Sequence, residues 1–330
     1  IDITVAKQLT ENAELSFKGV DKSGKFDIPK SLASKMLDAN SKNSDIVRLW
    51  YNGQDINNRP RDMWIIDFDE RSEQEAKLYK EPIDYVEKHI KPKRLKNNEA
   101  RQRNYWWQFS RSRPNMRAAI APLERSIVTT RVAKFRNFLW LDDTIVPDSA
   151  LVVIAREDDY FFGVLHSKLH EVWSLRMGTW LGKGNDPRYT STTTFETFPF
   201  PYIPSQEDES AEAYQAISQA AKQLHEERDA WLNPVEVKAN PEKRQDAKSL
   251  KLKDRTLTNL YNALAVWRGD DSMKIKAVAG DFAPRLDELH NTLDKAVCSA
   301  YGWDKSILED EEEILRHLLA LNLERAGNQE

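Results

Sequence analysis

The sequence predicts an α+β protein, in which a mixed β-sheet with flanking helices (residues 1–204) precedes an all-α helical domain (residues 205–330). Before Pro204, apolar residues alternate with polar ones or run in short blocks, as they do in strands. Beyond it, three long segments place apolar residues at helical spacing. Between the two parts, Pro199 and Pro201 lack the N–H that a central strand needs, so the "FPFP" step predicts a rigid domain boundary.

The elements up to residue 90 follow from local patterns. Ser16–Pro29 has two short alternating runs around a glycine-containing turn, which predicts a β-hairpin. Residues 29–39 have helical spacing, and "MWIIDF" (63–68) is apolar except for one aspartate, which predicts a buried strand. Residues 73–90 predict helix, with Pro82 opening a second helix at its first turn.

The middle of the chain predicts a run of strands followed by a helix and a polar loop. The strands are expected at residues 126–135, 137–143, 150–157 and 160–167. Residues 168–181 have helical periodicity that stops at Gly182. The threonine-rich residues 182–195 predict a polar loop that returns as a strand, because β-branched residues favour an extended backbone.

Three amphipathic helices are predicted after the boundary, at residues 210–232, 286–303 and 310–326. The polar, proline-containing residues 233–251 predict a mobile loop between the first two. We expect the buried faces of these helices to include Leu293, Trp303, Leu319 and Leu323.

Positive charge is concentrated in one tract of an otherwise acidic chain. From Lys88 to Arg136 there are 14 Lys/Arg and two acids (Glu99 and Glu124), a balance of 14 − 2 = +12. Because the whole chain carries −4, the remainder sums to −16. Such a basic block predicts a polyanionic partner, although a solvated basic surface without a partner would look the same.

Composition also bears on the compartment. No apolar run approaches the roughly 20 residues of a membrane helix, and the first residues lack the basic and apolar regions of a signal peptide. The single cysteine, Cys298, excludes an internal disulfide and fits a reducing cytoplasm. The absence of an initiator methionine suggests a fragment of a longer protein.

The polar loop carries side chains that can read DNA bases: Lys183, Asn185, Asp186 and Arg188. Arginine can pair bidentately with guanine, asparagine can pair with adenine, and a carboxylate can accept from cytosine. Presented on a glycine-flanked loop of a rigid sheet, these residues suit base reading in the major groove. A salt bridge of Arg188 to nearby acidic turns is the alternative.

Arginines interleaved with aromatic residues predict contacts that position a nucleic-acid backbone. The aromatic residues themselves, Tyr105, Trp106, Trp107 and Phe109, are expected more often in a core than as stacking platforms. A helix presenting Ser167, His170 and Trp173 could lie beside DNA as well, or could merely pack against the fold. The predicted backbone contacts are Arg101, Arg103, Arg111, Arg113, Arg131, Lys134, Arg136, Ser167 and His170.

Other chemistries are less well supported. His166 and His170 stand four apart beside Glu171, but no third ligand completes a metal site, so none is expected. "PDSALVVIAREDD" lacks the lysine of a magnesium-dependent nuclease motif. "LGKGNDPRY" lacks the Gly-Lys-Ser/Thr ending of a phosphate-binding loop and follows a helix instead of a strand.

Several longer motifs carry a family resemblance. "SFKGV", "NGQDINNRPRDMWIIDF", "PRYTSTTTFETFPFP" and "LDELHNTLDKAVCSAYGW…LLALNLERA" resemble, in this order, the C-terminal part of MmeI-like DNA methyltransferases. These are large bacterial single-chain restriction–modification or related methylase proteins. The resemblance implies that this chain is their target recognition domain and helical C-terminal domain, with base-contacting residues on the polar loop.

In that family the preceding domain is a class I, adenine-specific methyltransferase that uses S-adenosylmethionine. Neither its Asn/Asp-Pro-Pro-Tyr/Phe tetrapeptide nor a glycine-rich donor loop occurs here, so we expect this fragment to bind no cofactor and to be inactive alone. The resemblance therefore implies two partners, double-stranded DNA and the upstream methyltransferase domain, and no membrane. A helical protein–protein interaction module with an incidental basic tract is the alternative.

Overall fold

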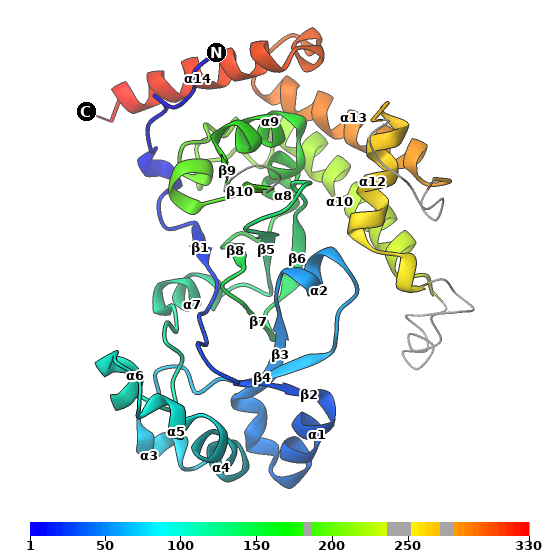
Figure 1. Ribbon diagram of the computed structural model, residues 1–330. Helices are drawn as coiled ribbons and strands as arrows, with labels where there is room; N and C mark the ends of the chain where they lie inside the picture. Colours follow the sequence, from blue (N-terminus) through cyan, green and yellow to red (C-terminus); the bar gives the residue numbers. More distant parts are fainter. Residues whose placement is uncertain (181–185, 236–251, 271–279, 330) are drawn as a thin grey trace.

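The computed structural model describes residues 1–180, 186–235, 252–270 and 280–329 (Figure 1). It confirms the α+β class. An antiparallel sheet in the middle of the molecule has the strand order β1 (Ser16–Lys18), β8 (Leu151–Ile154), β5 (Arg125–Thr130), β6 (Leu139–Asp142). A second sheet has the order β2 (Asp27–Pro29), β4 (Met63–Ile66), β3 (Val47–Tyr51), β7 (Ile145–Pro147), in which only β3 and β7 are parallel. A two-residue ladder joins β9 (Thr179–Trp180) to β10 (Pro187–Arg188).

The predicted hairpin at Ser16–Pro29 is wrong. β1 pairs with β8, so that Phe17 lies opposite Val153, whereas β2 pairs with β4 in the other sheet. Each strand is only three residues long, too short to be stable as an isolated pair, and each gains more by extending an existing sheet. The residues between them therefore link the two sheets.

Small helices lie around the second sheet, most of them at the bottom of Figure 1. The predicted helix at 29–39 is confirmed, and residues 73–90 do form two helices, with Pro82 in the first turn of the second. The first of these begins at Ser72, whose side chain and that of Glu75 form a reciprocal capping box. The helices are α1 (Lys30–Ala39), α2 (Gly53–Asn57), α3 (Glu73–Ala76), α4 (Lys80–His89), α5 (Lys91–Arg94), α6 (Ala100–Asn104) and α7 (Pro114–Ile120).

The predicted strand at 160–167 is also wrong, because this block forms helix α8 (Asp159–His166). The Asp158 side chain accepts the Phe161 N–H at 2.8 Å and caps the helix. A continuous apolar run fits either a buried strand or a buried helix, and here Tyr160 to His166 are all buried. Helix α9 (Lys168–Met177) follows, as predicted.

The strand expected in the threonine-rich stretch is a short π-helical turn, Ser191–Phe195. Thr190 caps it, since its hydroxyl accepts the Thr193 N–H at 3.2 Å. Threonine hydroxyls that bond the local backbone in this way offset the preference of the residue for extended structure.

All three helices predicted after Pro204 are confirmed, and one was missed. They are α10 (Glu212–Leu232), α13 (Ala283–Ala300) and α14 (Glu311–Gly327), with the unpredicted α12 (Leu257–Trp267) between the first two. Most of the predicted mobile loop, residues 236–251, lies outside the described residues. None of the described helices is long and apolar enough to cross a membrane.

The expected buried positions of these helices are only partly confirmed. Leu293 and Leu319 are buried and Trp303 is partly buried, but Leu323 is 42 % exposed. In that turn of α14 the neighbouring Asn322 faces the interior instead, where its amide donates to the carbonyls of Lys7 and Thr197.

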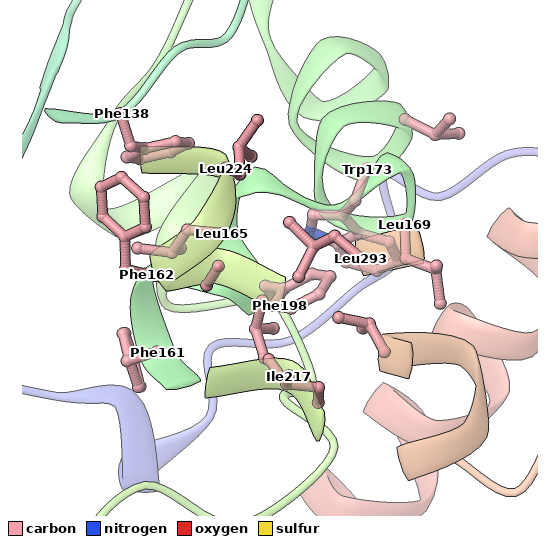
Figure 2. Packing of buried hydrophobic residues seen from close by; sticks show 14 of the residues in the cluster. Phe138, Phe161, Phe162, Leu165, Leu169, Trp173, Phe198, Ile217, Leu224 and Leu293 are labelled. Atoms are coloured by element: carbon pink, nitrogen blue, oxygen red, sulfur yellow. The ribbon is translucent and has the colours of Figure 1, made fainter. Parts of the chain in front are cut away.

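The central sheet lies between two apolar cores because its residues alternate. Ile127 and Ile154 belong to a core with the helices α8 to α14, whereas Val128 and Val153 face the second sheet. Figure 2 shows side chains from both sides of the FPFP step packed in the first core, including Phe138, Phe161, Phe162, Phe198, Ile217, Leu224 and Leu293.

Helices α8 and α10 approach each other closely at Gly163. A Cβ there would lie 2.8 Å from both the Ala221 Cβ and the Ile217 Cγ2. Only glycine allows this approach, so a residue before the boundary is fitted to helices after it. Phe198 and Phe200 are themselves fully buried in the shared core.

Candidate nucleic-acid interface

Four basic side chains from distant parts of the chain converge where β1, α7, β5 and β10 meet. We call Lys18, Arg113, Arg131 and Arg188 the basic cluster; each is partly exposed. Burial, and then the positive charges of Arg131 and Arg113, lower the pKa of Lys18, and the carboxylates of Asp21 and Asp148 offset this only in part. Burial, and then Arg188 and Arg113, lower the pKa of Arg131. Among the described residues, no carboxylate forms an ion pair with any member of the cluster.

Backbone contacts hold Arg131 and Arg188 side by side. Arg131 follows β5, and its carbonyl accepts the Tyr189 N–H at 2.7 Å. Val132 and Arg188 are directly paired in an antiparallel bridge. Arg188 thus lies both at the end of the β9–β10 ladder and against the end of a strand of the central sheet.

Gly19 brings Lys18 and Arg113 to the same place. A Cβ at Gly19 would lie 2.2 Å from the Asp148 carbonyl oxygen, so only glycine lets the end of β1 pack against this segment. The Gly19 carbonyl accepts the Arg113 Nε at 3.3 Å. Arg113 itself has a left-handed backbone, with φ of 61°, which directs the chain into α7.

The buried Arg136 anchors β10 by hydrogen bonding to its backbone. Arg136 is 4 % exposed and donates from Nη1 to the Thr130 carbonyl at 2.6 Å and from Nη2 to the Pro187 carbonyl at 3.2 Å. Its guanidinium lies 4.8 Å from the centre of the Tyr189 ring. Burial lowers the pKa of Arg136 to about 10. Arg136 therefore ties the end of β5 to the residues on either side of Arg188.

His170 holds Tyr189, the residue that follows β10. Its Nε2 lies 3.0 Å from the Tyr189 hydroxyl and its Nδ1 lies 2.9 Å from the Leu165 carbonyl. Since a carbonyl only accepts, Nδ1 carries the proton and Nε2 accepts from the tyrosine. Burial lowers the pKa of His170 to about 3, so this imidazole is neutral.

Three predicted backbone contacts are therefore corrected: Arg136, Ser167 and His170. All are buried, and Ser167 is occupied as the cap of α9 and as a donor to the Val164 carbonyl at 2.7 Å. The two Nη atoms of Arg136, the Ser167 hydroxyl and both ring nitrogens of His170 already bond to protein groups, so these side chains hold the local backbone instead of contacting a phosphate. Sequence alone did not distinguish them from surface residues, because arginine and serine are mostly exposed in proteins.

The other predicted contacts are spread around the cluster and α6. Arg111 and Lys134 are exposed, and the Arg101 guanidinium lies 5.4 Å from the Tyr105 ring centre. Arg103 donates to the carbonyls of Asn97 and Asn98 at 2.7 and 2.8 Å.

Of the predicted base-reading residues, Asp186 is exposed, whereas Lys183 and Asn185 lie outside the described residues. Trp106, Trp107 and Phe109 are buried, which confirms the expectation that these aromatic residues belong mostly to a core.

Comparison with known proteins gives the family. The protein-family model described as "MmeI, target recognition domain" matches residues 7–202 of the chain. The chain belongs to the MmeI target recognition family. A solved structure with the same fold is that titled "Structure of Type IIL restriction-modification enzyme MmeI in complex with DNA has implications for engineering of new specificities", with a TM-score of 0.68 and 18 % identity over 99 % of this chain. The chain spans 38 % of that enzyme's length. No curated protein matches the chain.

Within this recognition domain, sequence reasoning missed Lys18. The signal was present: Lys18 follows the half-buried Phe17 in an edge strand, and alternation places the two side chains on opposite faces. The two histidines weighed as metal ligands have other partners, since His166 contacts Phe138 and Arg228. In the described part of the chain, no three His, Cys, Asp or Glu residues are grouped to hold a metal.

Proposed function

We propose that this chain is the sequence-reading module of a bacterial adenine-specific DNA methyltransferase of restriction–modification type, acting in the cytoplasm. The methyltransferase domain, which would bind S-adenosylmethionine, would lie upstream in a longer protein. The module would fix the duplex in register while the target adenine is rotated out of the helix for methylation. The observation that carries the proposal is the basic cluster beside β10, on a domain whose family is named for target recognition.

The cluster divides naturally into two kinds of contact. Lys18, Arg113 and Arg131 would bond phosphates, which sets register without reading sequence. Arg188 would read a base edge, because it lies at the end of a short ladder whose backbone is tied to the central sheet. Asp186, Lys183 and Asn185 precede it on the same segment and would read neighbouring positions.

The helices after Pro204 bear on the alternative of a protein–protein interaction module. Such a module needs an apolar face that is left for a partner. The apolar residues of α10, α13 and α14 instead fill the core that they share with α8 and the central sheet, as Leu224, Leu293 and Leu315 do. This use of the helical faces favours the DNA-reading proposal.

Selection from a random duplex pool tests the proposal. We expect the wild-type chain to enrich a defined sequence, with affinity that falls as salt rises. The Lys18→Gln, Arg113→Gln, Arg131→Gln triple variant should lower the slope of log K against log[salt] by about 3, since each phosphate contact contributes about 0.9.

A matched control is Lys222→Gln with Lys305→Gln, two exposed lysines on the helical part, which should leave the slope unchanged. Enrichment of no sequence by the wild type, or equal slopes for both variants, would contradict the proposal.

A further inference from the structure

A second basic site lies in the small helical lobe, where α4 and α5 meet the segment after β1. In Figure 1 these helices are at the bottom of the molecule, away from β10. A cavity of about 170 Å³ is present there, and none of the residues that line it, all within the described part of the chain, is acidic. Its lining includes Lys25, Lys93, Arg94 and Gln102.

Arg94 forms the buried part of this cavity. It is 3 % exposed, and its Nη2 donates to the Lys22 carbonyl at 2.8 Å. Its Nε and Nη1 are shielded from solvent and have no hydrogen-bond partner among the described residues. Buried donors in native proteins are nearly always paired, so two unpaired donors on one side chain indicate a missing acceptor.

No carboxylate supplies that acceptor. Burial lowers the pKa of Arg94, and the charges of Glu99 and Asp21 offset this only in part. In the described part of the chain, neither acid forms an ion pair with Arg94 or lines the cavity. Glu99 instead accepts from Gln102 at 2.7 Å.

The chemistry of the lining selects an oxyanion. A guanidinium presents its N–H groups as a planar fork that matches two oxygens of a phosphate. Lys25 and Lys93, both exposed, add positive charge at the rim.

We propose that this cavity binds a phosphate group and that Arg94 is its principal ligand. The phosphate could be free in solution or part of a DNA backbone. The DNA case rests on the proposed function, whereas binding of free phosphate does not.

Calorimetric titration with inorganic phosphate, in chloride buffer without DNA, tests the site directly. We expect saturable binding with one site per chain, weakened at least tenfold by Arg94→Gln. Lys80→Gln is the matched control, because Lys80 is an exposed lysine of the same lobe already paired with Asp84. Non-saturable heats, or equal affinity in the wild type and Arg94→Gln, would overturn the proposal.

A rim variant covers the case in which Arg94→Gln does not fold. Lys25→Gln with Lys93→Gln leaves every contact of Arg94 intact and should weaken phosphate binding several-fold. Unchanged affinity in this folded variant would also overturn the proposal.

Duplex binding then separates the two sources. If the cavity holds a DNA phosphate, free phosphate should compete with duplex, and the rim variant should lower the salt slope by about 1 to 2. If it holds a free anion, phosphate binds while duplex affinity and slope stay as in the wild type. Failure of duplex binding alone would remove the proposed function and leave the phosphate site standing.

Discussion

The arginines inside the molecule differ from those of the basic cluster in what surrounds their charge. Arg228 is 1 % exposed, yet its Nη2 donates to the Phe138 carbonyl at 2.6 Å and its Nη1 to the Tyr261 hydroxyl at 3.1 Å. Its Nη1 also lies 3.2 Å from the His166 imidazole. In the basic cluster, by contrast, the Arg131 side chain donates to the Ser149 carbonyl at 3.4 Å, and the positive charges of Arg188 and Arg113 lower its pKa.

This difference in surroundings distinguishes arginines that stabilise the fold from those available to bind a ligand. Burying a cation is costly unless acceptors replace its hydration, and for Arg136 and Arg228 these acceptors include backbone carbonyls, so the two arginines fix the segments that they bind. Surface cations held close together repel each other and raise the affinity for an anion that would relieve that repulsion. Changes inside should therefore alter stability, whereas changes in the basic cluster should alter ligand binding.

The largest effect is expected from Arg228→Met. The substitution keeps much of the volume, but it removes the charged donor of the buried Phe138 carbonyl and of the Tyr261 hydroxyl, which keeps only His290 at 2.9 Å. At about 1.5–3 kcal/mol for each hydrogen bond to a charged group, the free energy of unfolding should fall by roughly 3–6 kcal/mol. Urea denaturation measures this, with Lys222→Gln as a surface control, and an unchanged midpoint would show that the interior network contributes nothing.

A buried carboxyl group should make stability depend on pH. Burial raises the pKa of Asp294 to about 7, although its side chain accepts the Lys168 N–H at 2.7 Å. Between pH 7 and 5 the folded state therefore holds a proton that the unfolded state, with an ordinary aspartate pKa of about 3.9, releases. Binding of this proton stabilises the folded state as pH falls, and the stabilisation is lost as pH rises through 7.

Asp294→Asn removes that contribution. On going from pH 7 to pH 5, the variant should lose about 2 kcal/mol of unfolding free energy relative to the wild type, at about 1.4 kcal/mol per unit of pKa difference. Denaturation curves at the two pH values measure the difference. Identical pH dependence of both proteins would mean that Asp294 is ionised in the fold.

Arg136→Lys should affect both stability and reading. A lysine keeps the charge but reaches fewer acceptors, so the ties to the Thr130 and Pro187 carbonyls are not both kept. We expect a loss of about 1 kcal/mol of unfolding free energy, the usual value of one hydrogen bond. The sequence enriched from a random pool should become less defined while the salt slope stays the same. A parallel loss of affinity for all sequences, with the enriched sequence intact, would contradict a positioning role.

Sequence patterns predict secondary structure reliably where one period fits one element. The three long amphipathic helices are of this kind, and the short apolar block "MWIIDF" was also predicted correctly as a strand, β4. The helix Asp159–His166 was missed because an all-apolar block has no period, and the hairpin was wrong because strand partners are chosen by tertiary packing. The same limit applies to the site: all of Arg113, Arg131, Arg136, Arg188 and His170 were predicted as DNA contacts, and only the burial of Arg136 and His170 separates them from the other three, which stay predictions.

The smallest change in affinity, and the most specific, is expected inside the basic cluster itself, from Arg188→Ala compared with Lys18→Gln. Both side chains are partly exposed, neither has an ion pair among the described residues, and neither change should move the unfolding midpoint. Arg188 lies at the end of the ladder, so its loss should cost about 1–3 kcal/mol of preference at one base pair. Lys18 would contact only phosphate, so its loss should lower the salt slope by about 1 and leave the enriched sequence intact.

Sequencing the duplexes that each variant selects distinguishes the two roles. If Arg188→Ala selects the wild-type sequence with lower affinity, then Arg188 is a phosphate contact like Lys18, and base reading belongs to other residues of the segment before it.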